Sequence, residues 1–84
     1  MRNYRKRYGQ AKVRYNSGNS EYEVTLIAEY QDDPVYGGQF DDDQITEVRN
    51  ADTDNVIPLN RIKPVLLEKI LNKCYPIAEY EMED

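Results

Sequence analysis

EYEVTLIAEYQ, residues 21–31, carries the clearest structural signal in the chain. Apolar and polar side chains alternate through it, and the apolar set is Tyr22, Val24, Leu26, Ala28 and Tyr30. A repeat of two residues that is rich in aromatic and β-branched side chains predicts a β-strand with one buried face. We therefore expect Leu26, at the middle of the apolar set, to lie in the core.

A second strand is expected just upstream, over Gln10–Tyr15. The residues between the two strands, Asn16–Ser20, are all turn formers, which predicts a β-hairpin. A four-residue loop at 16–19 sets a register that pairs apolar with apolar and cation with carboxylate, each pair contributing about 0.2–1 kcal/mol. This register places Arg14 opposite Glu21, Val13 opposite Tyr22 and Lys12 opposite Glu23.

Downstream, Pro34 and the pair Gly37–Gly38 break the alternation, so residues 32–43 are predicted to form a loop of about a dozen residues. Strand character returns over Gln44–Asn50. A polar turn, Ala51–Asn55, then precedes a short strand, Val56–Ile57, that Pro58 confines to an edge or an end. The unit from Ile45 to Leu59 is predicted to be a second hairpin.

A helix is expected near the C-terminus, with Asn60 as its N-cap and Pro64 in or just beyond its first turn. Pro76 should end it near Lys73. One apolar stripe, which is expected to cover the sheet and to place Leu66 in the core, comprises Ile62, Val65, Leu66 and Ile70. Leu67, Leu71 and Cys74 widen this stripe and would remain exposed on a monomer. We therefore expect the Leu67/Leu71 face to be covered by a homodimer or by a hydrophobic partner.

These elements predict an α+β fold, in which a small antiparallel sheet of three to four strands carries one C-terminal helix across one face. With 84 residues and 9.9 kDa there is room for one small domain. The expected organisation is a basic N-terminal arm at 1–9, a ββ-loop-ββ-α domain at 10–76 and an acidic tail at 77–84.

Charge is distributed unevenly along the chain. Residues 1–20 contain six basic residues and no acid, a charge of +6. Residues 21–84 contain five basic and sixteen acidic residues, a charge of −11, and no Lys or Arg lies between Tyr15 and Val48. Such asymmetry concerns partners and association rates more than the fold.

The composition disfavours catalysis and cofactor binding. The chain has no histidine, the commonest general base and zinc ligand. Neither Asp41–Asp43 nor Asp52–Asn55 has glycine at the sixth position that an EF-hand calcium loop requires, and Gly37–Gly38 lacks the lysine of a phosphate loop. Cys74, with no histidine to activate it, is interpreted as a buried small hydrophobe. We therefore predict no enzyme activity, no metal and no cofactor.

The N-terminal arm interleaves cations with aromatic rings, which is typical of a nucleic-acid contact. Its residues are Arg2, Tyr4, Arg5, Lys6, Arg7 and Tyr8. The acidic body would repel the same polymer, however. An arm that neutralises the protein's own acids, or that docks on an acidic partner, is the alternative.

The acidic segment predicts a surface that imitates a row of phosphates and occupies the nucleic-acid groove of a basic partner. The residues proposed to contact that partner are Asp32, Asp33, Tyr36, Phe40, Asp41, Asp42 and Asp43, with Glu29 and Tyr30 beside them. The alternative is that this segment is a solvated loop whose acids serve only solubility.

In layout, Tyr22–Cys74 resembles a diffuse group of small phage-encoded accessory proteins. The shared features are an apolar strand, an acidic loop with Pro, Tyr and Gly, an Ile-Thr-Glu-Val strand (Ile45–Val48), an Asp-rich turn and a short terminal helix. The chain departs from the pattern in its basic arm and in lacking a glycine at the Asp-rich turn. The resemblance implies a small accessory product that binds and disables a host protein, and it implies no site residue.

From these observations we expect a small phage-type protein that inhibits a host defence or nucleic-acid-processing complex. A nucleic-acid-binding accessory protein and a small structural or assembly component are the alternatives. No apolar run follows the basic N-terminus, so we expect neither a signal peptide nor a membrane span, and a location in the cytoplasm of a bacterial host.

Overall fold

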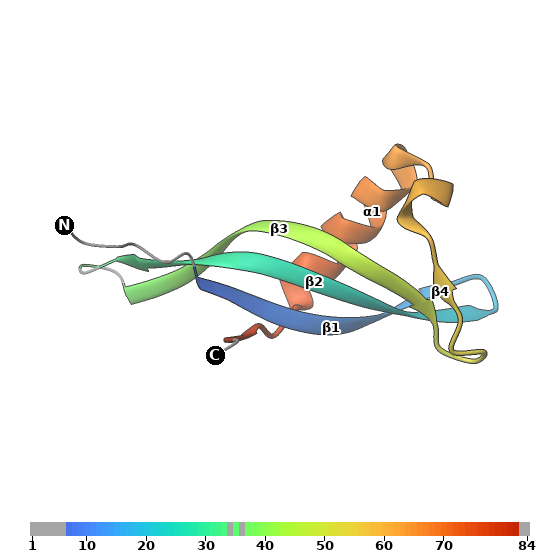
Figure 1. Cartoon of the computed structure of the whole chain (residues 1–84), viewed down its shortest axis with the longest axis horizontal. Helices are drawn as coiled ribbons and strands as arrows, with labels where there is room; N and C mark the ends of the chain where they lie inside the picture. The colour runs from blue at the N-terminus through green and yellow to red at the C-terminus, as the bar shows by residue number, and fades with distance from the viewer. Residues whose placement is uncertain (1–6, 34, 36, 83–84) are drawn as a thin grey trace.

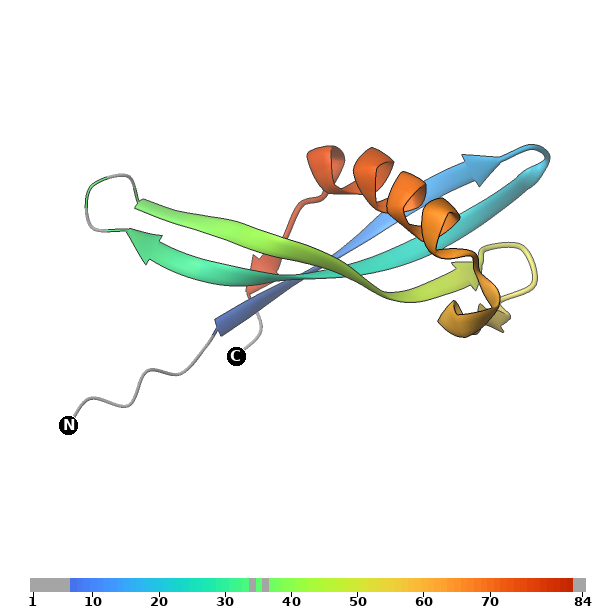
Figure 2. The same ribbon diagram turned by 90° about the horizontal axis from the view of Figure 1, so that it is seen from above.

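The computed structural model describes residues 7–33, 35 and 37–82, and its main feature is one curled antiparallel sheet with a single α-helix in its concave side (Figures 1 and 2). The strands follow the order β4-β3-β2-β1-β5 across the sheet. The elements are β1 (Arg7–Ser17), β2 (Ser20–Asp33), β3 (Gly37–Asn50), β4 (Val56–Ile57), α1 (Pro64–Cys74) and β5 (Glu81–Met82), with 3₁₀ turns at Leu59–Arg61 and Tyr75–Ile77.

The expected fold class is wrong, because most of the described residues lie in strands and the sheet has five of them. The helix does lie across one face, as expected. The excess of sheet comes from β2 and β3, which have 14 residues each. β2 extends to Asp33 and β3 begins at Gly37, so most of the segment 32–43 that was expected to be a loop is strand.

The molecule is elongated. It measures 50 × 23 × 23 Å and its radius of gyration is 14.7 Å, against about 12 Å expected for a compact domain of this length. The β2–β3 hairpin accounts for much of this length, since it extends well beyond α1 at one end, while the β1–β2 turn lies at the other end (Figure 2).

The first hairpin forms, but its predicted register is wrong by two residues. Its loop is the two-residue turn Gly18–Asn19, which begins with Gly18 at a φ of 59°, a conformation that favours glycine and suits tight hairpins. Arg14 therefore lies opposite Glu23, and Val13 lies opposite Val24. A shift of two keeps every side chain on its face. The expected ion pairs survive as diagonal contacts, Arg14–Glu21 at 3.0 Å and Lys12–Glu23 at 3.8 Å.

Two β-bulges interrupt β3 where it pairs with β2. One lies at Thr46, and the other places Asp42 and Asp43 opposite the single residue Ala28. Asp42 has a φ of 57°, which Asp tolerates better than most residues. Because bulges bend a strand and increase its twist, they account for the curl of the sheet around α1.

The core lies between the centre of the sheet and the C-terminal half of α1. Its buried members are Val13, Val24, Leu26, Ile70 and Cys74, with Leu71 and Tyr80 among the half-buried side chains packed against them. The prediction for Leu26 is confirmed, because its side chain is fully buried. The prediction for Leu66 is wrong, because that residue is 45% exposed.

The helix is rotated relative to the predicted stripe, so that Ile70 and Cys74 form its buried face. Cys74 is buried as expected, and burial raises the pKa of its thiol. Leu67 and Leu71 are half-buried, not exposed, which weakens the reason for expecting a dimer through them. That dimer stays a prediction.

The start of the helix also differs from the prediction. Pro64 is the first helical residue, and Lys63 precedes it in extended conformation without a side-chain cap. Asn60 lies in the preceding 3₁₀ turn and is not the N-cap. The second hairpin is confirmed, with Val48 opposite Ile57 and Arg49 opposite Val56. No helix among the described residues is long and apolar enough to span a membrane.

Candidate interaction surface

The distal half of the β2–β3 hairpin, here called the acidic arm, comprises Glu29–Asp33 of β2 and Gly37–Asp43 of β3. The two strands pair from Glu29 opposite Asp41 to Asp33 opposite Gly37. Only residues 34–36 separate them. The segment predicted as a loop is therefore a two-stranded ribbon that extends beyond α1 (Figure 2).

The glycine pair at 37 and 38 has two roles in this ribbon. Gly37 has a φ of 82°, a conformation that favours glycine, and begins β3 after the turn. Gly38 lies within the strand, where the ring of Tyr30 takes the space of a side chain. A Cβ at position 38 would lie 1.6 Å from the Tyr30 hydroxyl oxygen. An aromatic ring packed across a strand glycine is a recognised way to stabilise sheet pairing.

Phe40 belongs to an aromatic cluster and is half-buried, and its predicted role as a contact residue for a partner stays a prediction. Its ring packs edge-to-face on Tyr30, with centroids 5.3 Å apart, and stacks on Tyr80, with centroids 5.0 Å apart. Gly9 of β1 makes room for it, since a Cβ there would lie 2.4 Å from Phe40 Cε1. The guanidinium of Arg7 lies 5.6 Å from the centroid of Tyr30. The cluster fixes the base of the acidic arm to the body of the protein.

Asp43 is also part of the body. The Tyr80 hydroxyl donates a hydrogen bond to its carboxylate. Burial, then this hydrogen bond and the charge of Asp43, raise the pKa of the Tyr80 phenol far above its usual value. The neutral phenol is therefore the stable form, and it ties the segment before β5 to the second bulge of β3.

Removal of this hydroxyl by Tyr80→Phe is expected to reduce the free energy of unfolding by about 1–2 kcal/mol, because a half-buried carboxylate loses its donor. The effect should depend on pH. A phenol whose pKa is higher in the folded state stabilises the fold fully below the unfolded pKa of about 10 and progressively less above it. Urea denaturation should show that the free energy of unfolding falls more from pH 7 to pH 11 in the parent than in the variant. Equal losses would contradict the account.

Glu29, Asp32, Asp41 and Asp42 have no cationic partner among the described residues. Glu29 and Asp41 are half-buried and directly opposite each other in the ladder. Asp41 accepts a hydrogen bond of 3.2 Å from the Gln39 amide, and Asp32 and Asp42 are exposed. The backbone of Asp33 lies in the same ribbon, whereas Tyr36 is outside the described residues. The predicted role of these acids in binding a partner stays a prediction; Asp32, Asp41 and Asp42 are left without a described cation, whereas the carboxylate of Asp43 is held by Tyr80.

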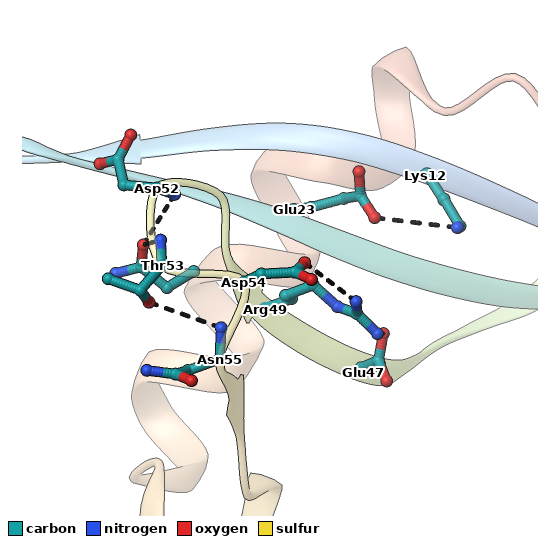
Figure 3. A network of polar contacts seen from close by, with 9 residues as sticks. Lys12, Glu23, Glu47, Arg49, Asp52, Thr53, Asp54 and Asn55 are labelled. Carbon is teal, nitrogen blue, oxygen red and sulfur yellow. Dashed lines mark hydrogen bonds and ion pairs between the residues drawn. The ribbon is translucent and has the colours of Figure 1, made fainter.

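The described ion pairs lie outside the acidic arm, and Figure 3 shows those of Lys12 and Arg49. Arg49 lies between Glu47, at 3.3 Å, and Asp54, at 3.0 Å, and these partners raise its pKa. The adjoining turn is held by Asn50, whose side-chain oxygen accepts from the backbone N–H groups of Asp52 and Thr53. The charges around Arg49 are therefore largely balanced, in contrast to those of the acidic arm.

The basic arm is described only in part. Arg2, Tyr4, Arg5 and Lys6 lie outside the described residues. Arg7 and Tyr8 begin β1, opposite Tyr30 and Glu29, so the basic segment enters the sheet beside the acidic arm. Tyr8 is exposed. Of the four cations of the basic arm, the structure therefore places only Arg7, beside Tyr30 of the acidic arm.

No group of three or more Asp, Glu, Cys or His in the described part of the chain is arranged to hold a metal ion. A cavity of about 420 Å³ lies beside β5, lined by Gln10, Ala11, Lys12, Glu79, Glu81 and Met82. Lys12 is already paired with Glu23, and Glu79 and Glu81 are exposed to solvent. The lining contains no nucleophile paired with a base.

Sequence reasoning missed the aromatic cluster. The Tyr30–Phe40 contact follows from pairing β2 with β3, and this pairing was hidden by the bulges. Tyr80 lies far along the chain, and nothing in its local sequence indicates its partners. A comparison with protein-family models, curated proteins and solved structures finds no significant match to the chain. The function proposed below therefore rests on the geometry of the chain itself.

Proposed function

We propose that this chain is a small phage-type binding protein that inhibits or modulates a nucleic-acid-binding protein of a bacterial host by presenting the acidic arm to its basic surface. The observation that carries this proposal is the pair Glu29 and Asp41. Like charges placed directly opposite in a ladder cost stability, and no described cation offsets them. Features that weaken a small fold without local compensation are expected where function requires them.

The charge density of the arm supports imitation of a nucleic acid. Without Asp43, whose carboxylate is bound by Tyr80, five acidic residues, Glu29, Asp32, Asp33, Asp41 and Asp42, belong to a ribbon whose longer strand has seven residues, a span of about 20 Å. This is one negative charge per roughly 4 Å, similar to the value of about 3.4 Å for a single nucleic-acid strand. A groove that binds phosphates would therefore meet a similar field on the arm.

Binding is favoured over catalysis by the same structure. The unbalanced charges lie on a projecting ribbon, not in an enclosed pocket that could exclude water. Phe40 and Tyr30 stiffen the ribbon from within, so that little conformational freedom is lost on binding. The arm is suited to fit into a groove on another protein.

Competition with DNA tests the proposal. Bacterial nucleic-acid-binding proteins are loaded on DNA–cellulose, and the purified chain is applied at constant salt. The parent should release at least one protein and form a complex with it. The variant Glu29→Gln/Asp41→Asn should release much less of that protein. Equal release by parent and variant, or no release by either, would overturn the proposal.

The same column tests the rival function, in which the basic N-terminal segment binds nucleic acid. One observation favours it: Arg7 and the exposed Tyr8 lead directly into that segment. Retention of the chain itself on DNA–cellulose, lost in the variant Arg2→Ala/Arg5→Ala/Lys6→Ala, would support the rival. The acidic arm should instead repel DNA, so we expect the parent chain to flow through.

A further inference from the structure

The edge of β1 between Ala11 and Ser17 has no neighbouring strand in the described part of the chain. β5 pairs with β1 only at Gly9 and Gln10, and β2 occupies the other edge along the whole strand. The pairing of β1 with β2 is regular, without a bulge. A regular open edge offers unpaired backbone N–H and C=O groups to which another strand can add.

The opposite edge of the sheet is protected. β4 covers only Val48 and Arg49 of β3, but two bulges bend the rest of that strand. It also carries three consecutive carboxylates, Asp41–Asp43. Bulges and charges are the usual protection of an edge strand against pairing. The open part of β1 is thus the more receptive edge.

We propose that a second copy of this chain pairs antiparallel along β1, with Tyr15 opposite Tyr15 of the second copy. In a symmetric pair of antiparallel strands, the two sheets turn the same face to the same side only if one residue lies opposite the identical residue of the other copy. If Val13 lies opposite Val13 of the second copy, Lys12 of each copy lies opposite Arg14 of the other. If Lys12 or Arg14 lies opposite its own counterpart, two cations again face each other. Pairing Tyr15 with Tyr15 of the second copy avoids contacts between cations, because Arg14 then lies opposite Asn16 and Val13 lies opposite Ser17.

Apolar surface at the same end of the molecule supports this register. Tyr15 lines a groove of about 140 Å³ together with Tyr22 and Leu66. Leu66 is 45% exposed, so part of its apolar side chain is open to solvent. A two-fold axis at Tyr15 brings this groove of one copy toward the same groove of the other. Pairing therefore covers apolar side chains as well as satisfying the backbone of the edge.

The dimer is independent of the proposed function but has a consequence for it. The β1–β2 turn and the acidic arm lie at opposite ends of the molecule (Figure 2). Pairing near Tyr15 therefore leaves the two acidic arms at the far ends of the dimer. Such a protein would be bivalent, which increases the apparent affinity for a partner with two suitable sites.

Sedimentation velocity tests the proposal over a range of concentrations up to about 1 mM. The parent should show a monomer–dimer equilibrium. Asn16→Lys places a second cation opposite Arg14 twice in each dimer, and Asn16→Glu places a carboxylate there twice. The dissociation constant should rise for the first variant and fall for the second, each by roughly twofold to thirtyfold.

The stability of the monomer provides an internal control. Position 16 lies opposite Glu21 of its own chain, so Lys at this position should stabilise the monomer and Glu should destabilise it. Monomer stability and dimer affinity therefore move in opposite directions in both variants, as thermal melting at low concentration will show. A parent that remains monomeric at the highest concentration would overturn the proposal. A dimer whose dissociation constant neither variant alters would overturn it too.

Discussion

Leu26→Ala is expected to reduce the free energy of unfolding by about 2–5 kcal/mol, a large part of the stability of a domain this small. The side chain is fully buried at the centre of β2, between Ala11 of β1 and Ile45 of β3. It packs in the same cluster as Ile70 and Cys74 of α1. Truncation leaves a cavity that these neighbours fill only partly, because strands on both sides hold β2 in place.

Leu66→Ala is the matched control, since it removes the same atoms from a residue that is 45% exposed. It should cost less than about 1 kcal/mol, because much of that side chain is in water in the folded state as well. Urea denaturation followed by circular dichroism gives the urea concentration at the midpoint of unfolding for each variant. The two midpoints report stability directly if the free energy of unfolding falls with urea at the same slope in both variants. Similar losses for both variants would contradict the position of the core described above.

The comparison of sequence and structure shows where local patterns suffice. β2 was predicted from its own alternation, because its buried apolar side chains, Val24, Leu26 and Ala28, recur every second residue. In β3 the inward side chains are Phe40, Asp43, Ile45 and Val48, at spacings of three, two and three. The bulges at Asp42 and Thr46 produce this spacing, which no regular strand or helix shows. The half of β3 after Asp43 was predicted as the strand Gln44–Asn50, whereas the half before it was assigned to a loop, because Pro34 and the glycine pair break the alternation and the bulges hide what remains of it.

The candidate surface was predicted only in part, because local sequence shows its acidic character but not the contacts between its strands. The acidic character of residues 29–43 follows from composition alone, and the structure leaves Asp32, Asp41 and Asp42 without a described cation. Which carboxylates face each other depends on the register of β2 with β3, a long-range property. The roles of Phe40 and Asp43 depend on Tyr80, which reaches them through the tertiary fold. Local sequence does not encode such contacts.

Neutralising the acidic arm is expected to slow association with its partner by about tenfold to a hundredfold at low salt. The variant replaces Glu29, Asp32, Asp41 and Asp42 with their amides and keeps Asp43, because its carboxylate holds Tyr80. Long-range attraction acts mainly on the association rate and is screened beyond about 10 Å at 0.1 M salt. The difference between parent and variant should therefore shrink as salt is added.

The fold of this variant should be intact. Replacement of Glu29 and Asp41 removes a pair of like charges in the β2–β3 ladder, so the melting temperature should stay the same or rise slightly. A control variant amidates four exposed acids outside the arm, at Asp52, Glu68, Glu79 and Glu81. Both variants change the formal net charge from −5 to −1, so only the position of the lost charges differs.

Stopped-flow measurement of the association rate, with the protein that the chain releases from DNA–cellulose, tests the central claim most directly. The arm variant should associate about tenfold or more slowly than the parent at low salt, and the control variant at nearly the parental rate. The three rates should converge as the ionic strength increases. Equal slowing of the two variants would contradict the claim, because net charge and not the acidic arm would then govern binding.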